Sequence, residues 1–244
     1  MRFPGSDIAL RFAEVEKRYP RQRVLADFSL EVEAGESFGL VGVNGAGKTT
    51  CIKALLDFCE IERGRIEIFG VRSGEPRARA RLAYLPERFL PPYYLRGRDF
   101  LAYMGRLYGH RPSQAELLTI LAALDLEAAA LDKPVRAYSK GMAQKLGLAA
   151  CLLSRRELAV LDEPLSGLDP KARLLVKRQL QAWRESGRTL FFSTHLLGDV
   201  AQLCDRVGVL HEGRMRFVGT PRALCERYQD ADLESAYLAC IETA

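Results

Sequence analysis

The feature that most constrains this chain is a glycine-rich segment at residues 42–49. The segment reads Gly42-Val43-Asn44-Gly45-Ala46-Gly47-Lys48-Thr49 and matches the pattern GxxxxGK[ST]. A strand-like run at 38–41 precedes it and a helix-like run at 50–56 follows it, which is the context that the motif requires. Glycines let the backbone curl so that successive N–H groups point at phosphate oxygens, and the start of the helix adds partial positive charge. The segment therefore predicts a loop that binds phosphate groups.

Side chains within this loop have distinct expected roles. Lys48 is expected to neutralise the β and γ phosphates of a nucleoside triphosphate, and the Thr49 hydroxyl to bind Mg²⁺. The other residues expected to contact the nucleotide are Gly42, Asn44, Gly45, Ala46, Gly47 and Thr50. A chance match in a chain of ordinary glycine content is on the order of one in a hundred, which disfavours a merely structural turn.

An acidic pair, Asp162 and Glu163, follows the short apolar run at 158–161. Ligands of open α/β sheets bind at the ends of such strands. Taken alone, the pair is equally consistent with a turn that ends a strand before Pro164. Beside a phosphate loop, Asp162 is expected to be a Mg²⁺ carboxylate, and Glu163 to polarise a water for attack on the γ phosphate.

Composition indicates an ordinary globular chain, with 48% hydrophobic residues, 27% charged residues and a net charge of +5. The longest uncharged apolar stretch, 146–153, is far shorter than the roughly 18 residues that a membrane-spanning helix needs, and residues 1–7 lack the apolar region of a signal peptide. We therefore expect a cytoplasmic protein. Charges of both signs are interspersed, so no nucleic acid is expected as a partner. The cysteines lack CxxC spacing, which favours reduced thiols.

Strand-like and helix-like segments alternate along the chain, the pattern of an α/β fold with a largely parallel sheet. Strands are predicted at 8–15, 25–32, 37–43, 65–69, 82–85, 158–161, 189–193, 207–210 and 215–218. Helices are predicted at 50–56, 100–108, 114–124, 142–153 and from Pro170 onward, the last capped by Asp169. Because strand signals vanish between residues 87 and 153, this stretch is predicted to be a helical insertion.

A second motif, Tyr138-Ser139-Lys140-Gly141-Met142, opens one of these helices, with Ser139 as its expected N-cap. In its position upstream of Asp162 it resembles the signature loop of ATP-binding cassette (ABC) ATPases, usually Leu-Ser-Gly-Gly-Gln. The resemblance extends over essentially the whole chain. Tyr19 matches the aromatic residue that stacks on adenine, Glu87 stands at the Q-loop position, residues 166–169 match the D-loop, and His195 matches the switch histidine. The tail, with Asp205-Arg206 and 219–221, looks like the subfamily that serves ABC-2-type exporters.

This resemblance implies a P-loop NTPase of the ABC ATPase type, with a mixed or parallel sheet core, an antiparallel β lobe and an inserted helical subdomain. It implies one domain over 1–244, in which 1–86 and 154–244 form the core with the β lobe and 87–153 form the helical subdomain.

The implied function is that of an exporter's motor subunit, which binds ATP and Mg²⁺ and drives a separate transmembrane permease. Lys48, Glu163 and His195 are the implied catalytic residues, and Thr49, Asp162 and Glu87 the implied metal site. Two subunits, identical or different, are expected to pair head to tail, so that Ser139 and Gly141 of one face the Lys48 loop of the other. The permease is expected to contact residues near Phe89 to Met104 and to hold the subunit at the inner face of the cell membrane.

Three departures from the family pattern leave alternatives open. Lys140 replaces the first signature glycine, Met142 the signature glutamine, and Glu87 the Q-loop glutamine. Altered coupling or rate is the inference for Glu87, because a carboxylate cannot donate hydrogen bonds. A regulatory subunit that binds ATP without turnover is one alternative. A soluble ABC ATPase acting in translation or DNA repair is another, although the single motif set disfavours it.

Aromatic residues concentrate in the first part of the predicted insertion. Phe100, Met104 and Tyr108 recur at i, i+4 and i+8, which predicts a face packed inside the helical lobe. Phe89, Tyr93 and Tyr94 lie around Pro91-Pro92 without a regular period. Such aromatics suit an exposed groove for a partner helix, since they supply contact area with little entropy to lose.

Overall fold

The computed structural model describes residues 8–20 and 22–243, so the prediction made for residues 1–7 lies outside this part of the chain. The strands are β1 (Ile8–Tyr19), β2 (Gln22–Glu33), β3 (Ser37–Val41), β4 (Arg63–Ile68), β5 (Val71–Arg72), β6 (Leu82–Leu85), β7 (Leu158–Asp162), β8 (Thr189–Thr194), β9 (Arg206–His211) and β10 (Arg214–Gly219). The α-helices are α1 (Lys48–Leu55), α2 (Gly97–Leu107), α3 (Gln114–Ala123), α4 (Lys140–Leu153), α5 (Pro170–Glu185), α6 (Leu197–Leu203), α7 (Pro221–Tyr228) and α8 (Leu233–Glu242). Short 3-10 helices occupy Pro76–Arg81, Ala128–Asp132 and Val135–Ala137.

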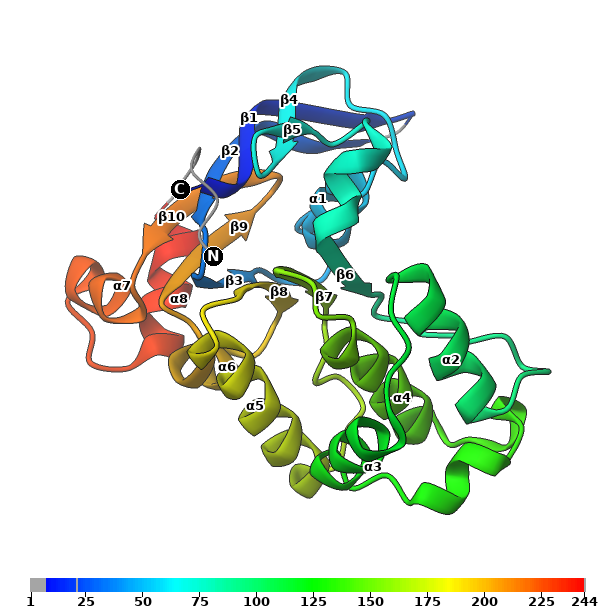
Figure 1. Cartoon of the computed structure of the whole chain (residues 1–244). Coiled ribbons are helices and arrows are strands. Elements are labelled where there is room, and N and C mark those ends of the chain that lie inside the picture. Colours follow the sequence, from blue (N-terminus) through cyan, green and yellow to red (C-terminus); the bar gives the residue numbers. More distant parts are fainter. Residues whose placement is uncertain (1–7, 21, 244) are drawn as a thin grey trace.

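The central sheet has the strand order β10-β9-β3-β8-β7-β6 (Figure 1). All neighbouring pairs are parallel except β10, which runs antiparallel to β9. Every strand of this sheet was predicted, and the mixed, mainly parallel order confirms the expected α/β fold. The carboxyl ends of β3, β7 and β8 meet at one edge, where the phosphate loop begins.

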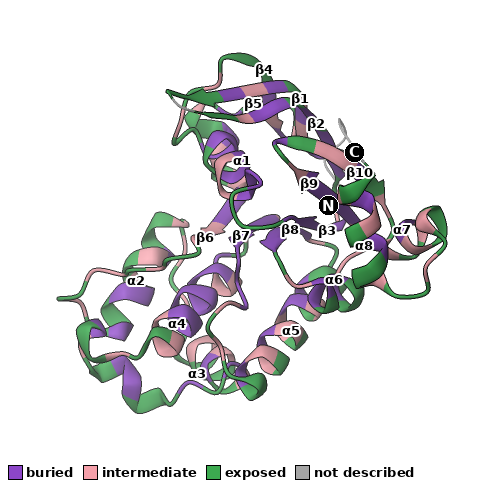
Figure 2. Cartoon of the chain, turned by 180° about the vertical axis from the view of Figure 1, so that it is seen from behind, coloured by how far each residue is buried: buried purple, intermediate pink, exposed green. Residues whose placement is uncertain are grey.

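Both faces of the central sheet are buried, which explains why its inner strands are continuous apolar runs. Along β7, Leu158 and Val160 pack into the cluster that contains α1, whereas Ala159 and Leu161 pack into the cluster that contains α4 and α5. Figure 2 shows the inner strands buried and the surrounding helices exposed on their outer sides. The sheet is therefore held between two cores, which fixes its carboxyl edge firmly.

A second, antiparallel sheet has the order β2-β1-β4-β5 and lies beyond α1 (Figure 1). Its first hairpin is longer than the sequence predicted, because β1 continues to Tyr19. Lys17 Nζ lies 3.3 Å from Glu62 Oε1, and Arg23 Nη2 lies 2.8 Å from Glu16 Oε1. The Arg23–Glu16 pair joins the two strands of the hairpin, the Lys17–Glu62 pair joins β1 to the segment before β4, and an alternating apolar pattern reveals neither.

In the described chain between β6 and β7, every regular element is a helix, and loops connect them, as predicted for the insertion. Ser139 caps α4 by accepting a hydrogen bond from the Met142 N–H at 3.2 Å, and Asp169 caps α5 in the same way. The core of this region also includes Ala83 and Leu85 of β6, so the helices and the sheet share one apolar cluster. Of the helices within 8–20 and 22–243, none has the length and apolar character to cross a membrane.

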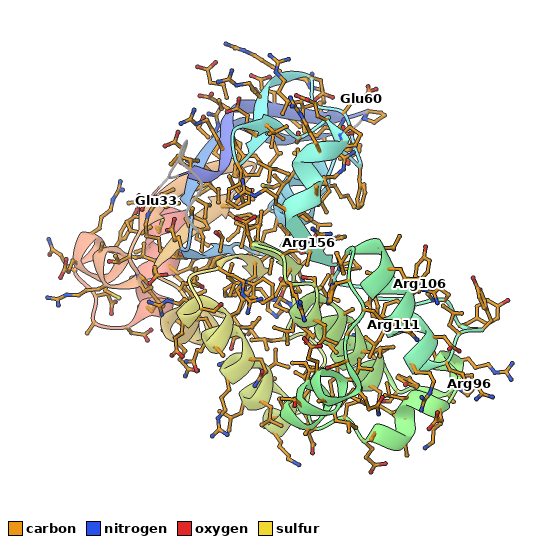
Figure 3. The ribbon with its side chains drawn as sticks, in the orientation of Figure 1. Glu33, Glu60, Arg96, Arg106, Arg111 and Arg156 are labelled. Atoms are coloured by element: carbon orange, nitrogen blue, oxygen red, sulfur yellow. The ribbon has the colours of Figure 1, made fainter. Side chains whose placement is uncertain are left out.

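The aromatic residues in and before α2 fall into two groups, one buried and one exposed. The face formed by Phe100, Met104 and Tyr108 packs into the helical core, as predicted. Phe89 corrects the prediction of an exposed groove residue, because its ring packs edge-on against Phe100 at a centroid distance of 5.6 Å. Tyr93 and Tyr94, in contrast, remain 68% and 70% exposed. In Figure 3, Arg96 and Arg106 also project outward from this part of the molecule.

Candidate functional site

The glycine-rich loop connects the end of β3 to the start of α1, and two of its glycines are required by close packing. At Gly42, a Cβ atom would lie 2.4 Å from the carbonyl oxygen of Leu210. At Gly47, φ is +114° and a Cβ atom would lie 2.8 Å from the carbonyl oxygen of Val24. Side chains at either position would push the loop away from the sheet, so the glycines fix its path as well as its conformation.

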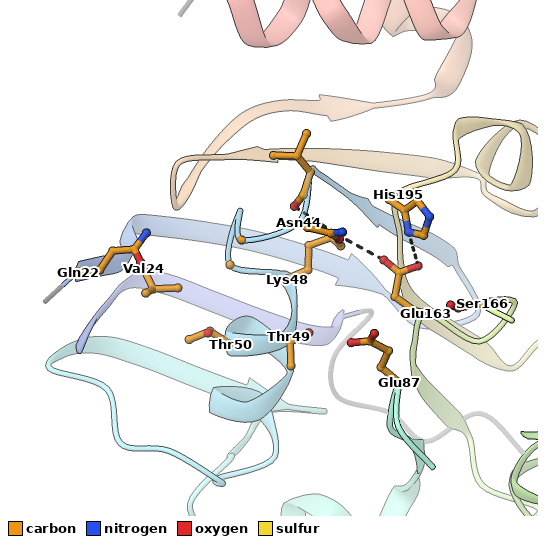
Figure 4. A pocket seen from close by; sticks show the side chains of 13 residues that line it. Gln22, Val24, Asn44, Lys48, Thr49, Thr50, Glu87, Glu163, Ser166 and His195 are labelled. Carbon is orange, nitrogen blue, oxygen red and sulfur yellow. Dashed lines mark hydrogen bonds and ion pairs between the residues drawn. The ribbon is translucent and has the colours of Figure 1, made fainter. Parts of the chain in front are cut away.

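This loop forms one wall of a pocket of about 530 Å³ at the carboxyl edge of the central sheet (Figure 4). Predicted site residues that line the pocket are Asn44, Gly45, Gly47, Lys48, Thr49, Thr50, Glu87, Glu163 and His195. Gln22 and Val24 also line the pocket and were not predicted. Val43, within the predicted phosphate loop, and Ser166, within the D-loop match, line it as well, although neither was given a role of its own. Residues from distant parts of the chain therefore converge on the phosphate loop.

Lys48 is held in place by the loop that it follows. Its Nζ donates to the Gly42 carbonyl oxygen at 2.6 Å and to the Val43 carbonyl oxygen at 3.3 Å. The same ammonium lies 3.5 Å from Glu163 Oε1. Only 6% of Lys48 is exposed, so its charge is directed into the pocket rather than toward bulk solvent, where it acts strongly on a bound anion.

Glu163 is fixed by contacts at both its backbone and its side chain. Its N–H donates to the Ser193 hydroxyl at 3.0 Å, and its Oε2 lies 2.9 Å from His195 Nδ1. The backbone at Glu163 has a φ of +48°, which is uncommon for a residue with a side chain. Such strain persists where surrounding contacts determine it, and here it aims the carboxylate between Lys48 and His195 (Figure 4).

Asp162 lies behind the pocket wall and is 1% exposed. The Ser193 hydroxyl donates to its Oδ1 at 2.5 Å. Burial raises the pKa of the Asp162 carboxyl, hydrogen bonds from Ser193 and Thr49 oppose that shift, and the negative charges of Glu87 and Glu163 add to it. Ser193, which the sequence analysis did not single out, thus braces both members of the acidic pair.

The oxygen groups around Thr49 fit a magnesium ion that is shared with a phosphate ligand. The Thr49 hydroxyl contacts the Asp162 carboxylate, and the charges of Glu87 and Glu163 reach the same carboxylate. No cage of three or more potential metal ligands occurs within 8–20 and 22–243. The Thr49 hydroxyl beside the Asp162 carboxylate suits Mg²⁺, which is usually held by one or two protein ligands together with phosphate oxygens and water.

The remaining predicted site residues lie outside the pocket lining. Gly42 and Ala46 shape the loop from behind, whereas Tyr19 is 40% exposed at the hairpin end and pairs with Gln22, which does line the pocket. Ser139 is exposed at the start of α4, and neither it nor Gly141 lines the pocket. Within this one chain, the site therefore contains the loop, the acidic pair and His195, but not the signature segment.

Comparison with known proteins supports the interpretation of this pocket. The family described as "ABC transporter" matches residues 25–166. A Nod factor export ATP-binding protein I of Burkholderia lata is 37% identical over 232 residues, which cover 93% of this chain and 75% of that protein. A solved structure described as the ATP binding subunit of an ABC transporter superposes with a TM-score of 0.86 at 31% identity and covers 95% of this chain and 99% of that one.

Other relatives are longer than the region they share with this chain. An uncharacterized ABC transporter ATP-binding protein of Synechocystis is 39% identical over 199 residues, which are 80% of this chain. Those residues are only 56% of the Synechocystis protein. The chain thus spans little more than half the length of that relative.

Proposed function

The chain belongs to the ABC transporter family, and on this premise we propose that it is the ATP-hydrolysing motor subunit of an exporter whose transmembrane permease is a separate chain. The observation that carries the proposal is the pocket in which Lys48, Glu163 and His195 converge on the phosphate loop. Export is proposed from the printed function of the Burkholderia relative and from the tail residues noted in the sequence.

ATP is the proposed ligand of the pocket. The loop N–H groups and the Lys48 ammonium hold the phosphates, and Thr49, Asp162 and Glu87 would hold Mg²⁺ beside them. When bound, Mg²⁺ neutralises charge on the β and γ phosphates. Tyr19 is proposed to stack on adenine, a role supported by its exposure and by its pairing with the pocket residue Gln22.

Hydrolysis requires a group that orients water and accepts its proton. In the proposed reaction, the oxygen of a water attacks the γ phosphorus, the bond to the bridging oxygen of ADP breaks, and the water proton passes to the Glu163 carboxylate. His195 fixes that carboxylate through its Nδ1 contact at 2.9 Å. Lys48 neutralises charge on the transferred group, and its present contact with Glu163 Oε1 at 3.5 Å shows that both groups reach the same space.

A second subunit is proposed to complete the site with Ser139 and Gly141. Their position outside the pocket of their own chain, and the exposure of Ser139, support this arrangement. Lys140, the departure from glycine, does not obstruct the segment, because its side chain lies against Gly167 of its own chain. Homodimer and heterodimer both satisfy the proposal.

The permease is proposed to dock on the segment from Phe89 to Met104. Tyr93 and Tyr94 are its exposed aromatic residues, and Leu90 beside them is 88% exposed. Because Phe89 and Phe100 anchor this segment in the helical core, a force on the exposed rings would reach the region that follows Glu87. Docking there places the subunit at the cytoplasmic face of the membrane. We also propose the division into 1–86 with 154–244 and the helical 87–153.

Phosphate release by the purified chain tests the function. With Mg·ATP, the wild-type chain should release phosphate in the steady state, and Lys48→Ala should abolish release without unfolding the protein. ATP binding without release, both alone and with the co-expressed permease, would instead identify a regulatory subunit. The same measurement with permease in the membrane determines whether turnover is coupled to it.

A further inference from the structure

A buried carboxylate with two cationic partners lies next to the site and has no part in the chemistry above. Asp199, in the first turn of α6, is 2% exposed. Arg173 Nη2 donates to both carboxylate oxygens at 3.1 Å, and Lys177 Nζ lies 2.7 Å from Oδ1. Both cations project from α5, so these contacts join two neighbouring helices (Figure 1).

Stability alone is a weak explanation for this cluster. Removing charged groups from water costs free energy, and replacing buried ionic clusters with well-packed apolar residues often leaves a protein equally stable or more stable. Asp199 is surrounded in its helix by Leu197, Val200 and Leu203, all of which are buried. An apolar residue would suit this position, so the charged contacts matter for the segments that they hold in place rather than for stability alone.

One end of the cluster leads to the loop at 166–169. Arg173 lies one turn into α5, and its backbone N–H donates to the Asp169 carbonyl oxygen at 2.9 Å. Asp169 in turn caps α5 by accepting from the Ala172 N–H at 2.9 Å. At the start of the same loop, the Ser166 N–H donates to the Glu163 carbonyl oxygen at 3.1 Å. This side of the cluster therefore connects to Glu163 through the backbone of residues 166–169.

The other end leads to the histidine. Asp199 lies four residues after His195 in the chain, and its N–H donates to the Leu196 carbonyl oxygen at 3.2 Å. Helix α6 has only 7 residues and no side-chain cap at its start, and helices this short are unstable without tertiary contacts. The ionic contacts of Asp199 anchor that first turn, and His195 just before it contacts Glu163 Oε2.

The ionic contacts of Asp199 thus join two segments that both contact Glu163, the 166–169 loop and the segment that contains His195. Figure 4 shows Ser166 and His195 beside Glu163. We propose that Asp199 is a positioning residue which, through Arg173 and Lys177, holds the His195 segment in register with the 166–169 loop. The 166–169 loop and the His195 segment, which contact Glu163 from two sides, then move together. This inference rests on the proposed function only for its effect on hydrolysis, since the mechanical link itself exists without nucleotide.

Hydrogen exchange on the nucleotide-free chain, followed by steady-state kinetics, tests the link. The variants are Asp199→Asn, Arg173→Gln and their combination. Glu36→Gln is the matched control, because Glu36 is also buried at 8% exposure and pairs with Arg206 at 3.3 Å, but it precedes β3 at the end opposite the phosphate loop. If Asp199→Asn does not fold, Lys177→Gln takes its place in the same two measurements, because it removes one cation from Asp199 and leaves Arg173 in place.

We expect Asp199→Asn to raise amide exchange in 166–173 and in 195–203 together, while Glu36→Gln raises it in neither. Phosphate release should fall about 10- to 100-fold in kcat with KM within about threefold, as a displaced but intact catalytic group predicts. The kcat of the double variant should be no lower than that of the more severe single variant, because Asp199→Asn and Arg173→Gln break the same ionic contact.

Exchange that rises only in 195–203, or a kcat that stays at the wild-type value, would overturn the proposal. If the wild-type chain itself releases no phosphate, the proposed function fails, and paired exchange in the two segments still decides whether the link exists.

Discussion

Replacing Glu163 by glutamine removes one negative charge from the pocket while it preserves the length of the side chain. The amide oxygen can still accept from Lys48 or from His195, whose atoms lie 3.5 Å and 2.9 Å from the two carboxylate oxygens. The amide cannot take a proton from water. Loss of a positioned general base lowers rates by about 10²- to 10⁴-fold, which corresponds to about 3 to 5 kcal/mol in the barrier.

Binding of ATP should survive this change, because the phosphate loop and Lys48 are untouched. The charge of Glu163 contributes to the raised pKa of Asp162, so Glu163→Gln should lower that pKa toward its ordinary value. The variant should therefore bind ATP at least as tightly as the wild type and accumulate an ATP-dependent dimer, which light scattering detects. Glu163→Asp is the matched variant, since it keeps the charge but withdraws the carboxylate.

Phosphate release distinguishes the outcomes. Glu163→Gln should lose nearly all turnover, and Glu163→Asp should retain more of it than the amide does. Near-normal release by Glu163→Gln would remove this residue from the role of base, and failure to form the ATP-dependent dimer would contradict the separation of binding from hydrolysis.

Three further sets of substitutions test other parts of the proposed function and the fold. Tyr19→Ala should weaken ATP binding by roughly 5- to 150-fold, from a stacking contribution of about 1 to 3 kcal/mol, while Tyr19→Phe changes it little; unchanged affinity in a nucleotide titration would exclude stacking. Tyr93→Ala with Tyr94→Ala should leave folding and basal hydrolysis intact, because both rings are mostly exposed, but should weaken co-purification with the permease; normal co-purification would place the docking site elsewhere. Gly42→Ala places a Cβ 2.4 Å from a backbone oxygen of β9, so it should lower stability by about 1 to 3 kcal/mol and weaken ATP binding. Gly74→Ala is the control, because a Cβ there would come no nearer than 3.9 Å to the Asp57 side chain; equal denaturation midpoints for the two variants would refute the clash.

Local patterns were sufficient to predict the parts of the site that lie at strand ends. The glycine loop and the acidic pair each follow an apolar run directly, so their positions could be predicted from a spacing of a few residues, while the roles proposed for their side chains stay predictions. The caps at Ser139 and Asp169 are equally local, and both are present. The family resemblance added His195, whose contact with Glu163 no sequence interval could indicate.

Tertiary contacts account for what the sequence did not reveal. Ser193 faces the acidic pair only because β7 and β8 pair in register. The ionic cluster of Asp199 depends on how α5 packs against α6, and its only sequence signal is an acidic residue among buried apolar neighbours. Phe89 was assigned to an exposed groove because its segment has no period, yet Phe100 provides a partner for its ring.

Complementation between two inactive variants tests most directly whether the pocket is half of a two-chain catalytic site. A Ser139→Arg subunit supplies an intact Lys48 loop, and a Lys48→Ala subunit supplies an intact Ser139 segment. In random pairs, half of the dimers are mixed and each has one intact site of two, so an equal mixture should release phosphate at about a quarter of the wild-type rate. A mixture no more active than the sum of its separate components would contradict the composite site.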